Sequence, residues 1–417
     1  MRLLFCNYEY PPLGGGGGAA TALLAEELAA RRHEVTVLTS QGLGLPVEEV
    51  RSGVRIVRVP VLFRRQQASA NFASMFAYMA RAPRIARQRF APGAFDLVNT
   101  HFVLPSGPVG HDLARTFGLP NVLSLHGGDL YDPSKRTSPH RHRPLRAWVR
   151  RLLRAADHLV GQSADTLANV RRYYDSELRV SRIPLSIRRP PPGAGRRADY
   201  GFAAGDTLLV TVGRLVARKA VDQLLTTLSG LPPSTHLLII GSGPGEAALR
   251  RQAAELGIAG QVHFLGFVPE DEKYRILRMA DLYVSTSQHE GFGLVFLEAM
   301  ACGLPVLCYD RGGQNDFLSS GTTGAVIPLN DRRRFAAAVA YLLGDPDRCR
   351  ATGARNLARV EAYFAEHCVR RYEAVFEVVL AAHRRSRRAG LAAAAIPADL
   401  LAAAAGVMPD RSERQPL

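Results

Sequence analysis

The sequence lacks the features that mark metal-bound, redox-active or membrane-spanning chains. Its five cysteines are widely scattered with no C-x-x-C pair, which disfavours a zinc site or a redox couple and fits a reducing compartment. No run of roughly 18 apolar residues occurs, because the alanine-rich stretch at 391–408 is interrupted by Pro397 and Asp399. The first apolar run, residues 3–6, is too short for the core of a signal peptide. We therefore expect a cytoplasmic protein, either in solution or peripheral on the inner leaflet of the membrane.

Two common nucleotide-binding signatures are also missing. The P-loop pattern G-x-x-x-x-G-K-[ST] does not occur. Residues 14–19 satisfy G-x-G-x-x-A, but a dinucleotide site also needs an acidic residue at the end of the next strand, where this chain reads Leu38-Thr39-Ser40-Gln41. A nicotinamide or flavin is therefore disfavoured, and no cofactor is expected.

What the chain has in excess is positive charge. Its 53 Lys and Arg residues, mostly Arg, face 37 acids and give a formal net charge of +16. Such an excess implies an anionic partner, with nucleic acid, an anionic membrane surface and a phosphorylated substrate as the candidates. A hydrophobic content of 47% is ordinary for a globular protein, and 417 residues fit two or three domains.

Short apolar runs alternate with helical patterns along most of the chain. This alternation predicts parallel sheets with helices on both faces. One series of strands precedes a Pro- and Gly-rich segment at 187–195, and a second series follows it. The expected strands are 3–6, 35–39, 54–59, 96–100, 121–125 and 157–161, then 207–212, 236–240, 262–265, 282–285, 306–308 and 325–327.

The predicted fold class is therefore α/β, with two doubly wound, Rossmann-like domains that face a central cleft. The N-terminal domain spans 1–188 and the C-terminal domain 196–360. A helix at 361–386 is expected to pack back toward the N-terminal domain, and the Ala-rich tail at 387–417 is expected to be disordered. Ligands of such sheets bind outside the carboxyl ends of the strands, so the turns that follow strands are the candidate sites.

The first of these turns contains five consecutive glycines, Gly14 to Gly18, followed by a helical pattern at 21–31. Glycines let a ligand approach the backbone closely, and a helix N-terminus offers free N–H groups to an anion. A phosphate site is one interpretation. A flexible loop that only turns the chain is the other.

Charged residues follow two strands of the C-terminal half. Arg214 and Lys219 come after strand 207–212 and suit a diphosphate, although a solvated basic loop would explain them equally well. After strand 282–285, Glu290 and Glu298 lie eight residues apart, around an expected helix N-terminus. Two carboxylates there could accept from the hydroxyls of a hexose and a ribose on either side of a pyrophosphate. Ordinary helix-surface and helix-dipole roles are the alternative.

Together these motifs resemble the retaining glycosyltransferases of family GT4, which have the GT-B fold of two Rossmann-like domains. The resemblance runs from the first strand to about residue 380. It implies transfer of a hexosyl group from a nucleoside-diphosphate sugar to an acceptor hydroxyl. A lipid-linked or cell-envelope glycan, as in polysaccharide biosynthesis, is one candidate acceptor. The motifs that carry it are the N-terminal glycine loop, Gly213-Arg214-Leu215 with Lys219, Gly241-x-Gly243, Gly266-Phe267-Val268, Glu290-Gly291-Phe292-Gly293 with Glu298, and Gly312-Gly313.

The resemblance also implies roles for matching residues. The implied catalytic set is Glu290, Lys219, Arg214 and His126, the last beside the donor sugar, with a structural histidine as the alternative. Asp129, close after His126, is the candidate on the acceptor side. The implied donor-binding residues are Gly15, Gly16, Arg214, Lys219, Val268, Glu290, Gly291, Phe292, Gly293, Leu294 and Glu298.

The chain departs from the family pattern at three places. Ala220 stands where glycine is usual, Asp316 stands where glutamate is common, and the linker reads Ile183-Pro184-Leu185-Ser186. None of these touches the expected phosphate contacts or the carboxylate pair. They leave the substrate open.

The resemblance implies a reaction that retains the anomeric configuration. Arg214, Lys219 and helix N-termini can neutralise the leaving diphosphate without a metal. The Asp-x-Asp motif of the other major transferase fold occurs only at 345–347, in an expected turn between late helices, so no metal is expected. Attack from the face of the leaving group and a covalent intermediate both stay open. A sugar-nucleotide 2-epimerase or phosphorylase of the same fold, and a catalytically silent sugar-nucleotide-binding module, are the alternative functions.

Two basic segments lie in the N-terminal domain. Residues 135–154 contain eight Lys or Arg and no acid, and their apolar stripe around Trp148 most simply faces the core. Residues 64–89 add six Arg and no acid around Phe72 and Phe76. Docking on an anionic inner leaflet, where a lipid-linked acceptor would be met, is one interpretation, and a soluble Arg-rich surface is the other. Nucleic acid is disfavoured because the segments lack aromatic platforms.

Overall fold

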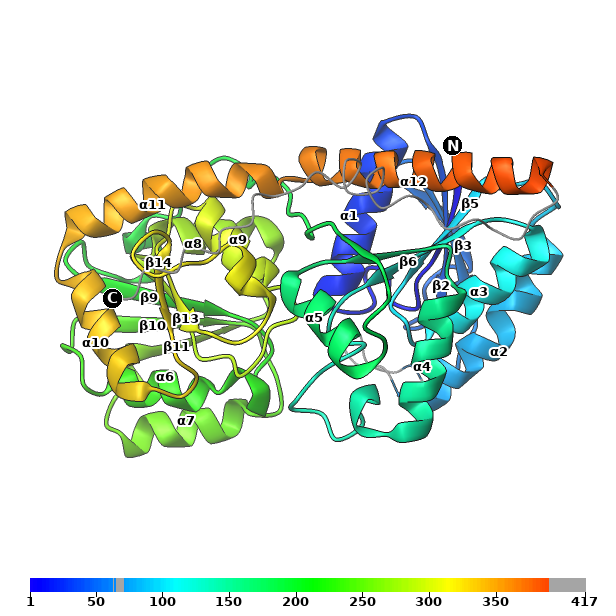
Figure 1. The fold of residues 1–417 in the computed structure, drawn as a ribbon. Helices are drawn as coiled ribbons and strands as arrows, with labels where there is room; N and C mark the ends of the chain where they lie inside the picture. The colour runs from blue at the N-terminus through cyan, green and yellow to red at the C-terminus, as the bar shows by residue number, and fades with distance from the viewer. Residues whose placement is uncertain (63, 65–70, 390–417) are drawn as a thin grey trace. The chain divides into compact units, whose positions relative to one another are not determined.

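The computed structural model describes residues 1–62, 64 and 71–389. The chain divides into two compact units, of which unit 1 comprises Met1–Ser186 with the chain from Ala365 onward and unit 2 comprises Ile187–Phe364. Each unit is a parallel sheet with helices on both faces (Figure 1), so the predicted α/β class with two parallel-sheet domains is confirmed. Most of the tail expected to be disordered, from residue 390, lies outside the described residues.

Unit 1 contains an eight-stranded sheet in the order β3-β4-β2-β1-β5-β6-β7-β8. All neighbours are parallel except β3, which pairs antiparallel with β4. This edge strand was not predicted, because its sequence Glu-Glu-Val-Arg is mostly charged, as suits an exposed edge. The strands are β1 Arg2–Cys6, β2 Glu34–Ser40, β3 Glu48–Arg51, β4 Val54–Val59, β5 Leu97–His101, β6 Asn121–Leu125, β7 His158–Gly161 and β8 Val180–Arg182.

Among the described residues of unit 1, six helices cover this sheet. They are α1 Gly16–Ala30, α2 Phe72–Arg89, α3 Ser106–Phe117, α4 Arg143–Ala155, α5 Ala164–Tyr173 and α12 Ala365–Arg388, with a short 3-10 turn η1 at Pro139–Arg141. Helices α1 and α12 lie side by side (Figure 1), and Val369, Tyr372 and Phe376 of α12 share a buried cluster with Leu3 and Phe5 of β1. Helix α12, the last helix in the described part of the chain, is therefore part of the core of unit 1.

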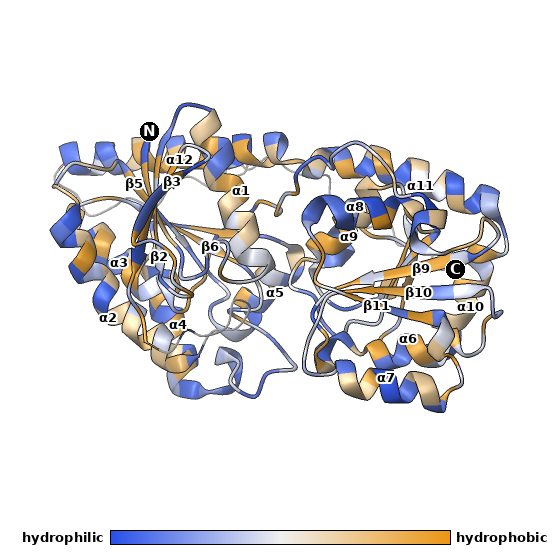
Figure 2. Ribbon diagram, turned by 180° about the vertical axis from the view of Figure 1, so that it is seen from behind, coloured by the Kyte–Doolittle hydropathy of each residue, from blue (hydrophilic) through white to orange (hydrophobic). Residues whose placement is uncertain are grey.

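Unit 2 contains a six-stranded parallel sheet in the order β11-β10-β9-β12-β13-β14. Its inner strands are mostly buried, because helices cover both faces, and Figure 2 shows the apolar residues of β9 and β10; the edge strands β11 and β14 are only partly buried. The strands are β9 Thr207–Val212, β10 Thr235–Ile240, β11 Val262–Gly266, β12 Leu282–Ser285, β13 Val306–Tyr309 and β14 Gly324–Ile327. The helices are α6 Val221–Leu228, α7 Glu246–Glu255, α8 Glu270–Met279, α9 Leu294–Ala301, α10 Arg332–Leu343 and α11 Pro346–Val360, with 3-10 turns η2 Arg197–Tyr200, η3 Ala217–Lys219, η4 Ala259–Gln261, η5 Gly313–Asp316 and η6 Glu361–Tyr363.

The strand order of each sheet reverses at one point. In unit 1, β1 lies between β2 and β5, and in unit 2, β9 lies between β10 and β12. The loops that follow the two strands on either side of such a reversal leave in opposite directions and open a crevice at the carboxyl edge, which is where doubly wound sheets bind ligands. The loops after β9 and β12 in unit 2, and after β1 and β5 in unit 1, are therefore the positions to inspect.

Helix α1 begins at Gly16, earlier than the predicted start at Thr21. The polyglycine run is thus partly helical and is not a loop throughout. A Cβ on Gly17 would lie 2.3 Å from the Phe102 ring, and one on Gly18 would lie 3.2 Å from the backbone oxygen of Glu9. The first turn of α1 needs glycines because neighbouring groups occupy the space of side chains.

The apolar stripe of α4 faces inward. Val149, Leu152 and Leu153 are buried in a cluster with strand residues, and Trp148 packs against it. Arg150 and Arg154 of the same helix pair with Asp175 at 3.4 and 2.6 Å. None of the helices in the described part of the chain combines the length and apolarity needed to cross a bilayer.

Candidate functional site

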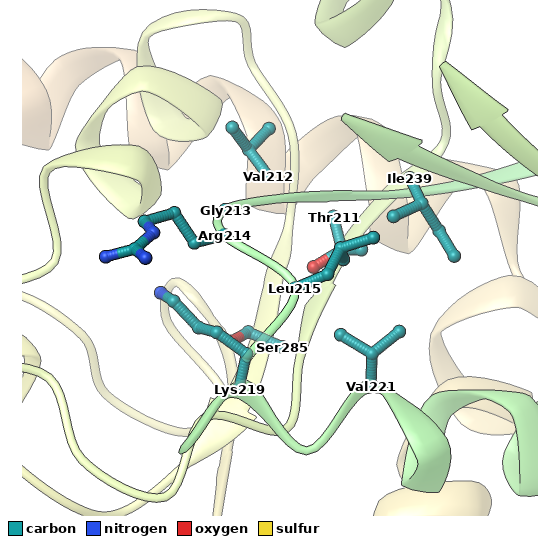
Figure 3. Close-up of a pocket in the computed structure, with 9 residues that line it drawn as sticks. All are labelled: Thr211, Val212, Gly213, Arg214, Leu215, Lys219, Val221, Ile239 and Ser285. Atoms are coloured by element: carbon teal, nitrogen blue, oxygen red, sulfur yellow. The ribbon is translucent and has the colours of Figure 1, made fainter. Parts of the chain in front are cut away.

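The loop after β9 forms a small pocket lined by both predicted phosphate-binding cations. Arg214 and Lys219 extend to the same side of this loop, while Leu215, Val221 and Ile239 lie on the other side (Figure 3). The loop is attached to the segment after β12, since Thr286 Oγ1 donates to the Ala220 oxygen at 2.8 Å. The loops on the two sides of the strand-order reversal in unit 2 are therefore bonded to each other.

Glu290 is fixed by its backbone to the predicted Gly312-Gly313 turn. Its N–H donates to the Arg311 oxygen at 3.2 Å, and its own oxygen accepts from the Gly313 N–H at 3.0 Å. Gly312 has φ +121°, and a Cβ there would lie 2.0 Å from the Glu290 oxygen. Only glycine permits this approach, which explains why the two motifs occur together in the sequence.

The side chain of Glu290 is the centre of a buried ionic cluster. Its Oε1 accepts from Lys219 Nζ and, at 2.6 Å, from Ser287 Oγ, while Oε2 lies 3.4 Å from Arg218 Nη1. Burial alone would raise the pKa of Glu290, but the charges of Lys219 and Arg218 and these hydrogen bonds outweigh it and lower the pKa to about 2. Glu290 is thus a carboxylate at any physiological pH.

Glu298, on α9, has a different environment. Its Oε1 forms an ion pair with Lys273 Nζ of α8 at 2.9 Å, and both side chains are largely buried. Its Oε2 is buried and has no hydrogen-bond partner among the described residues. Burial raises the pKa of Glu298 although Lys273 opposes the shift. A buried, unpartnered carboxylate oxygen is an acceptor that a ligand hydroxyl can satisfy.

Lysine is rare in this chain, and its positions are informative. Of the 53 basic residues only three are lysines: Lys135, Lys219 and Lys273. Two of the three pair with the two predicted carboxylates, Glu290 and Glu298. An ammonium is a compact point charge with three donors, so it can hold a carboxylate and still donate to a ligand. Sequence reasoning missed Lys273, although the scarcity of lysine in an Arg-rich chain could have marked it.

The remaining donor residues predicted in unit 2 lie around the start of α9 and the end of β11. Gly293 is the N-cap of α9 with φ +95°, and Phe292 before it is buried. The helix starts at Leu294, so its free N–H groups lie where they were expected. Val268 follows Gly266, which has φ +66°, and lies next to Phe267, whose side chain is 83% exposed.

In unit 1, the predicted phosphate-binding glycines lie at the start of α1. Gly15 is the N-cap, and Gly16 is the first helical residue. The Gly15 N–H donates to a carboxylate oxygen of Glu9 at 3.2 Å. In this state an anionic group of the chain itself occupies part of the helix N-terminus.

His126, which follows β6, is buried and held on several sides. Its Nε2 lies 3.0 Å from His101 Nδ1, the Phe102 ring stacks on it at 4.1 Å, and Gln162 Nε2 donates to its oxygen at 2.6 Å. Burial lowers the pKa of His126 to about 3. Its Nδ1 has no hydrogen-bond partner among the described residues.

Asp129 supports this loop. One carboxylate oxygen accepts from the His126 N–H at 3.1 Å and the other from the Val103 N–H at 2.7 Å. Burial raises the pKa of Asp129 to about 6 although the backbone hydrogen bonds oppose the shift. In this structure the predicted acceptor-side residue connects the loops after β5 and β6.

The structure therefore groups the predicted residues within each unit. Arg214 and Lys219 line one pocket, and Lys219 contacts Glu290. His126 and Asp129 form one loop in unit 1. Sequence reasoning missed the residues that hold these groups in place; the described ones are Asn99, His101, Gln162, Arg218, Lys273 and Ser287.

The Asp-x-Asp segment at 345–347 is engaged in structural contacts. Asp345 is the N-cap of α11, accepts from the Arg348 N–H at 3.0 Å and pairs with the Arg348 side chain. Asp347 pairs with Arg350. These carboxylates serve a helix start, as predicted for a turn between late helices.

Comparison with known families divides the chain as its fold does. Residues 14–188 match the family described as Glycosyltransferase Family 4, and residues 196–358 match Glycosyl transferases group 1. The two matches cover most of unit 1 and unit 2, respectively.

Curated relatives and solved structures agree with these matches. The chain is 31% identical over 305 residues to a D-inositol 3-phosphate glycosyltransferase of Nocardia farcinica, which covers 67% of this chain and 65% of that protein. It is 31% identical over 352 residues to a 2-deoxystreptamine N-acetyl-D-glucosaminyltransferase of Streptomyces fradiae, which covers 78% of this chain and 82% of that protein. Sucrose-phosphate synthase of Thermosynechococcus elongatus superimposes with a TM-score of 0.79 at 25% identity, over 91% of this chain and 99% of that one.

Proposed function

The chain belongs to glycosyltransferase family 4, and from this membership we propose that it moves a hexosyl group from a nucleoside-diphosphate sugar to an acceptor hydroxyl with retention of configuration. The observation that carries the proposal is the cluster of Lys219, Arg218 and Glu290 at the strand-order reversal of unit 2. It combines cations for a diphosphate with a carboxylate that stays ionised and can accept from sugar hydroxyls.

We assign the nucleoside diphosphate to unit 2. Arg214 and Lys219 line the same pocket and would neutralise charge on the leaving phosphate. The N–H groups at the start of α9 would add to this stabilisation. Glu298, with its unpartnered Oε2, would accept from the ribose hydroxyls. Gly15, Gly16 and Val268 are proposed as further donor contacts on the family resemblance alone.

Departure of the diphosphate is the step that these residues would make easier. The acceptor oxygen forms a bond to the anomeric carbon, the bond from that carbon to the phosphate oxygen breaks, and the acceptor proton goes to a phosphate oxygen. Glu290, whose pKa is lowered to about 2, carries no proton to give and acts as a hydrogen-bond acceptor. Because cations of the chain can neutralise the leaving group, we propose that no metal ion is needed.

The proposal is tested first by binding and then by turnover. Thermal-shift measurements against the diphosphates of uridine, guanosine and adenosine, and against their sugars, identify the donor. Incubation of that donor with acceptor should release free nucleoside diphosphate only when acceptor is present, and excess EDTA should not abolish release. Release without acceptor, or 2-epimerisation of the sugar, would assign the chain to an epimerase. Phosphate-dependent release of sugar phosphate from a glycan would assign it to a phosphorylase, and binding without turnover would leave a sugar-nucleotide-binding module.

For the acceptor we propose a lipid-linked or cell-envelope glycan, reached from an anionic membrane surface. Phe72 and Phe76, one turn apart on α2, are each 62% exposed in a segment rich in arginine. Exposed aromatic rings beside cations are typical of helices that bind at an anionic interface. Flotation with vesicles of equal parts phosphatidylglycerol and phosphatidylcholine should recover the protein at low salt and lose it at high salt. Equal recovery with phosphatidylcholine alone, or none with either, would contradict membrane docking.

A further inference from the structure

A chain of three polar side chains, Asn99, His101 and His126, lies at the carboxyl ends of β5 and β6. Asn99 Oδ1 lies 2.7 Å from His101 Nε2, and His101 Nδ1 lies 3.0 Å from His126 Nε2. The three residues are 0%, 1% and 7% exposed, so solvent does not compete for these hydrogen bonds. In a chain of this kind, the direction of each bond decides which ring nitrogen carries the proton at the far end.

The direction is set at Asn99. Its Nδ2 lies 3.0 Å from the Val122 backbone oxygen, which can only accept, so the amide oxygen must face His101. That oxygen can also only accept, and His101 therefore carries a proton on Nε2. Burial lowers the pKa of His101 well below its ordinary value, so this ring carries no second proton. Its Nδ1 is a bare acceptor.

The same reasoning extends to His126. Its Nε2 must donate to the bare Nδ1 of His101, and burial keeps this ring neutral as well. The remaining nitrogen, Nδ1, is then an acceptor that is buried and has no partner among the described residues. Leaving such a group unpaired costs free energy, which a donor hydroxyl from a bound molecule would recover.

We propose that Asn99 and His101 are positioning residues that hold His126 in the tautomer with a bare Nδ1. The family resemblance places His126 beside the donor sugar, so in this tautomer Nδ1 would accept a hydrogen bond from a hydroxyl of that sugar. The identity of the hydroxyl rests on the proposed function, whereas the tautomer does not. The stacked Phe102 ring fixes where the imidazole lies, and hydrogen bonds of the His126 backbone, from Gln162 and to Asp129, hold its loop. The relay from Asn99 fixes where its proton lies.

The tautomer can be read without any substrate. Nitrogen-15 NMR of the full chain, labelled in its histidine rings, should show His126 with a protonated Nε2 and a bare Nδ1 at neutral pH. Its resonances are assigned by their loss in His126→Gln. A proton on Nδ1, or on both nitrogens, would overturn the proposal. Because no sugar nucleotide is present, this measurement stands even if the chain proves not to transfer hexosyl groups.

A matched pair of substitutions tests the relay. Asparagine and leucine have the same number of side-chain heavy atoms and the same branching. His101→Asn can keep an amide oxygen near the position of the ring Nδ1, where it accepts from His126 Nε2, whereas His101→Leu has no polar atom there. His101→Leu should give a mixture of His126 tautomers, and His101→Asn should keep the wild-type tautomer. Wild-type tautomer in both variants would show that the relay does not set the proton. Thermal melting establishes whether each variant is folded. If His101→Leu does not fold, the wild-type spectrum alone still tests the tautomer.

Kinetics then connect the tautomer to the sugar. With UDP-glucose or GDP-mannose, whichever is turned over, His101→Leu should lower kcat/KM about tenfold and His101→Asn less than about threefold. One monodeoxy analogue of that donor should be about tenfold poorer than the parent for wild type and equally good for His101→Leu, because the lost hydroxyl no longer meets an acceptor. If His101 had a purely structural role, His101→Leu would lower kcat/KM for the parent donor and for its deoxy analogue by the same factor. That result would overturn the sugar contact while the NMR result decides the tautomer.

Discussion

At the carboxyl edge of its sheet, unit 1 buries a neutral chain of hydrogen-bonding side chains, whereas unit 2 buries paired charges. In unit 1, His101 and His126 are kept uncharged by burial and bond directly to each other, and His101 also bonds to Asn99. In unit 2, Glu290 and Glu298 are each paired with a lysine. Neutral acceptors suit sugar hydroxyls, and a cationic cluster suits a diphosphate. The difference teaches that two sheets of the same type acquire different binding chemistry through the polarity of the residues after their strands.

Removing the charge of Lys219 should have the largest effect. Lys219→Met is expected to lower kcat about 100- to 1000-fold, because it removes a cation from the developing charge of the leaving group. Lys135→Met is the matched control. Because the Lys135 side chain is 62% exposed, this substitution should leave the transfer rate unchanged. Transfer rates of the two folded variants settle the comparison. Equal rates would show that the charged region of unit 2 does not act in the reaction.

Acid should weaken unit 2 through Glu290. The folded protein binds this proton more weakly than the unfolded chain does, since the pKa is lowered to about 2, so the stabilisation is complete above the ordinary pKa of 4.5 and is lost as the pH falls toward 2. At pH 7 the unfolding free energy of the wild type should exceed that of Glu290→Gln by on the order of 3 kcal/mol. At pH 3.5 this difference should be smaller by about 1 kcal/mol.

Urea denaturation at the two pH values measures this difference. Glu246→Gln, which removes half of the i,i+4 pair with Arg250 on α7, is the control and should change stability by less than about 0.5 kcal/mol at either pH. A gap for Glu290→Gln that does not shrink on acidification would show that the carboxylate is not stabilised by its two cations.

Lys273 should affect nucleotide binding through Glu298. Lys273→Leu is expected to weaken binding of the preferred nucleoside diphosphate about tenfold, because Glu298 loses the partner that orients its free oxygen. Calorimetric titration checks this, with inorganic pyrophosphate as the ligand that lacks a ribose and should be unaffected. An equal loss of affinity for pyrophosphate would show that Lys273 acts on the phosphates and does not act through the ribose.

The smallest effect concerns Ala220, which has φ +46° in the left-handed region. Ala220→Gly should leave the unfolding free energy unchanged or raise it by up to about 0.5 kcal/mol, because relief of backbone strain offsets the added freedom of the unfolded chain. Ala217→Gly, in the neighbouring turn, should lower it by about 0.5–1 kcal/mol. Loss of stability in both variants would contradict the explanation that glycine is usual at position 220 because of its left-handed backbone conformation.

Much of the fold was predictable from local patterns. The central strands of both sheets are buried on two faces and therefore read as continuous apolar runs, which is why all their approximate positions were recovered. The edge strands β3 and β8 and the start of α1 at Gly16 were not recovered. Charged residues do not mark an exposed strand, and three glycines predict a loop unless the nearby Phe102 ring is known.

The candidate site was recovered only in part for a similar reason. Glu290, Glu298, Arg214 and Lys219 follow strands in recognisable glycine contexts. Lys273 and His101 do not, because what gives them significance is a partner far along the chain. Lys273 meets Glu298 only because α8 packs beside α9 in unit 2, and His101 meets His126 only because β5 and β6 are neighbours.

The sequence by itself determined the strand and helix pattern, the two-domain α/β class and the family, because apolar periodicity and short glycine motifs act over a few residues. Only the tertiary structure decided which charges neutralise one another and which acceptors are left unpaired. Those properties depend on burial and on contacts between loops that a sheet brings together from distant parts of the chain. A carboxylate has a different pKa in each such environment, and an imidazole also differs in which ring nitrogen carries its proton.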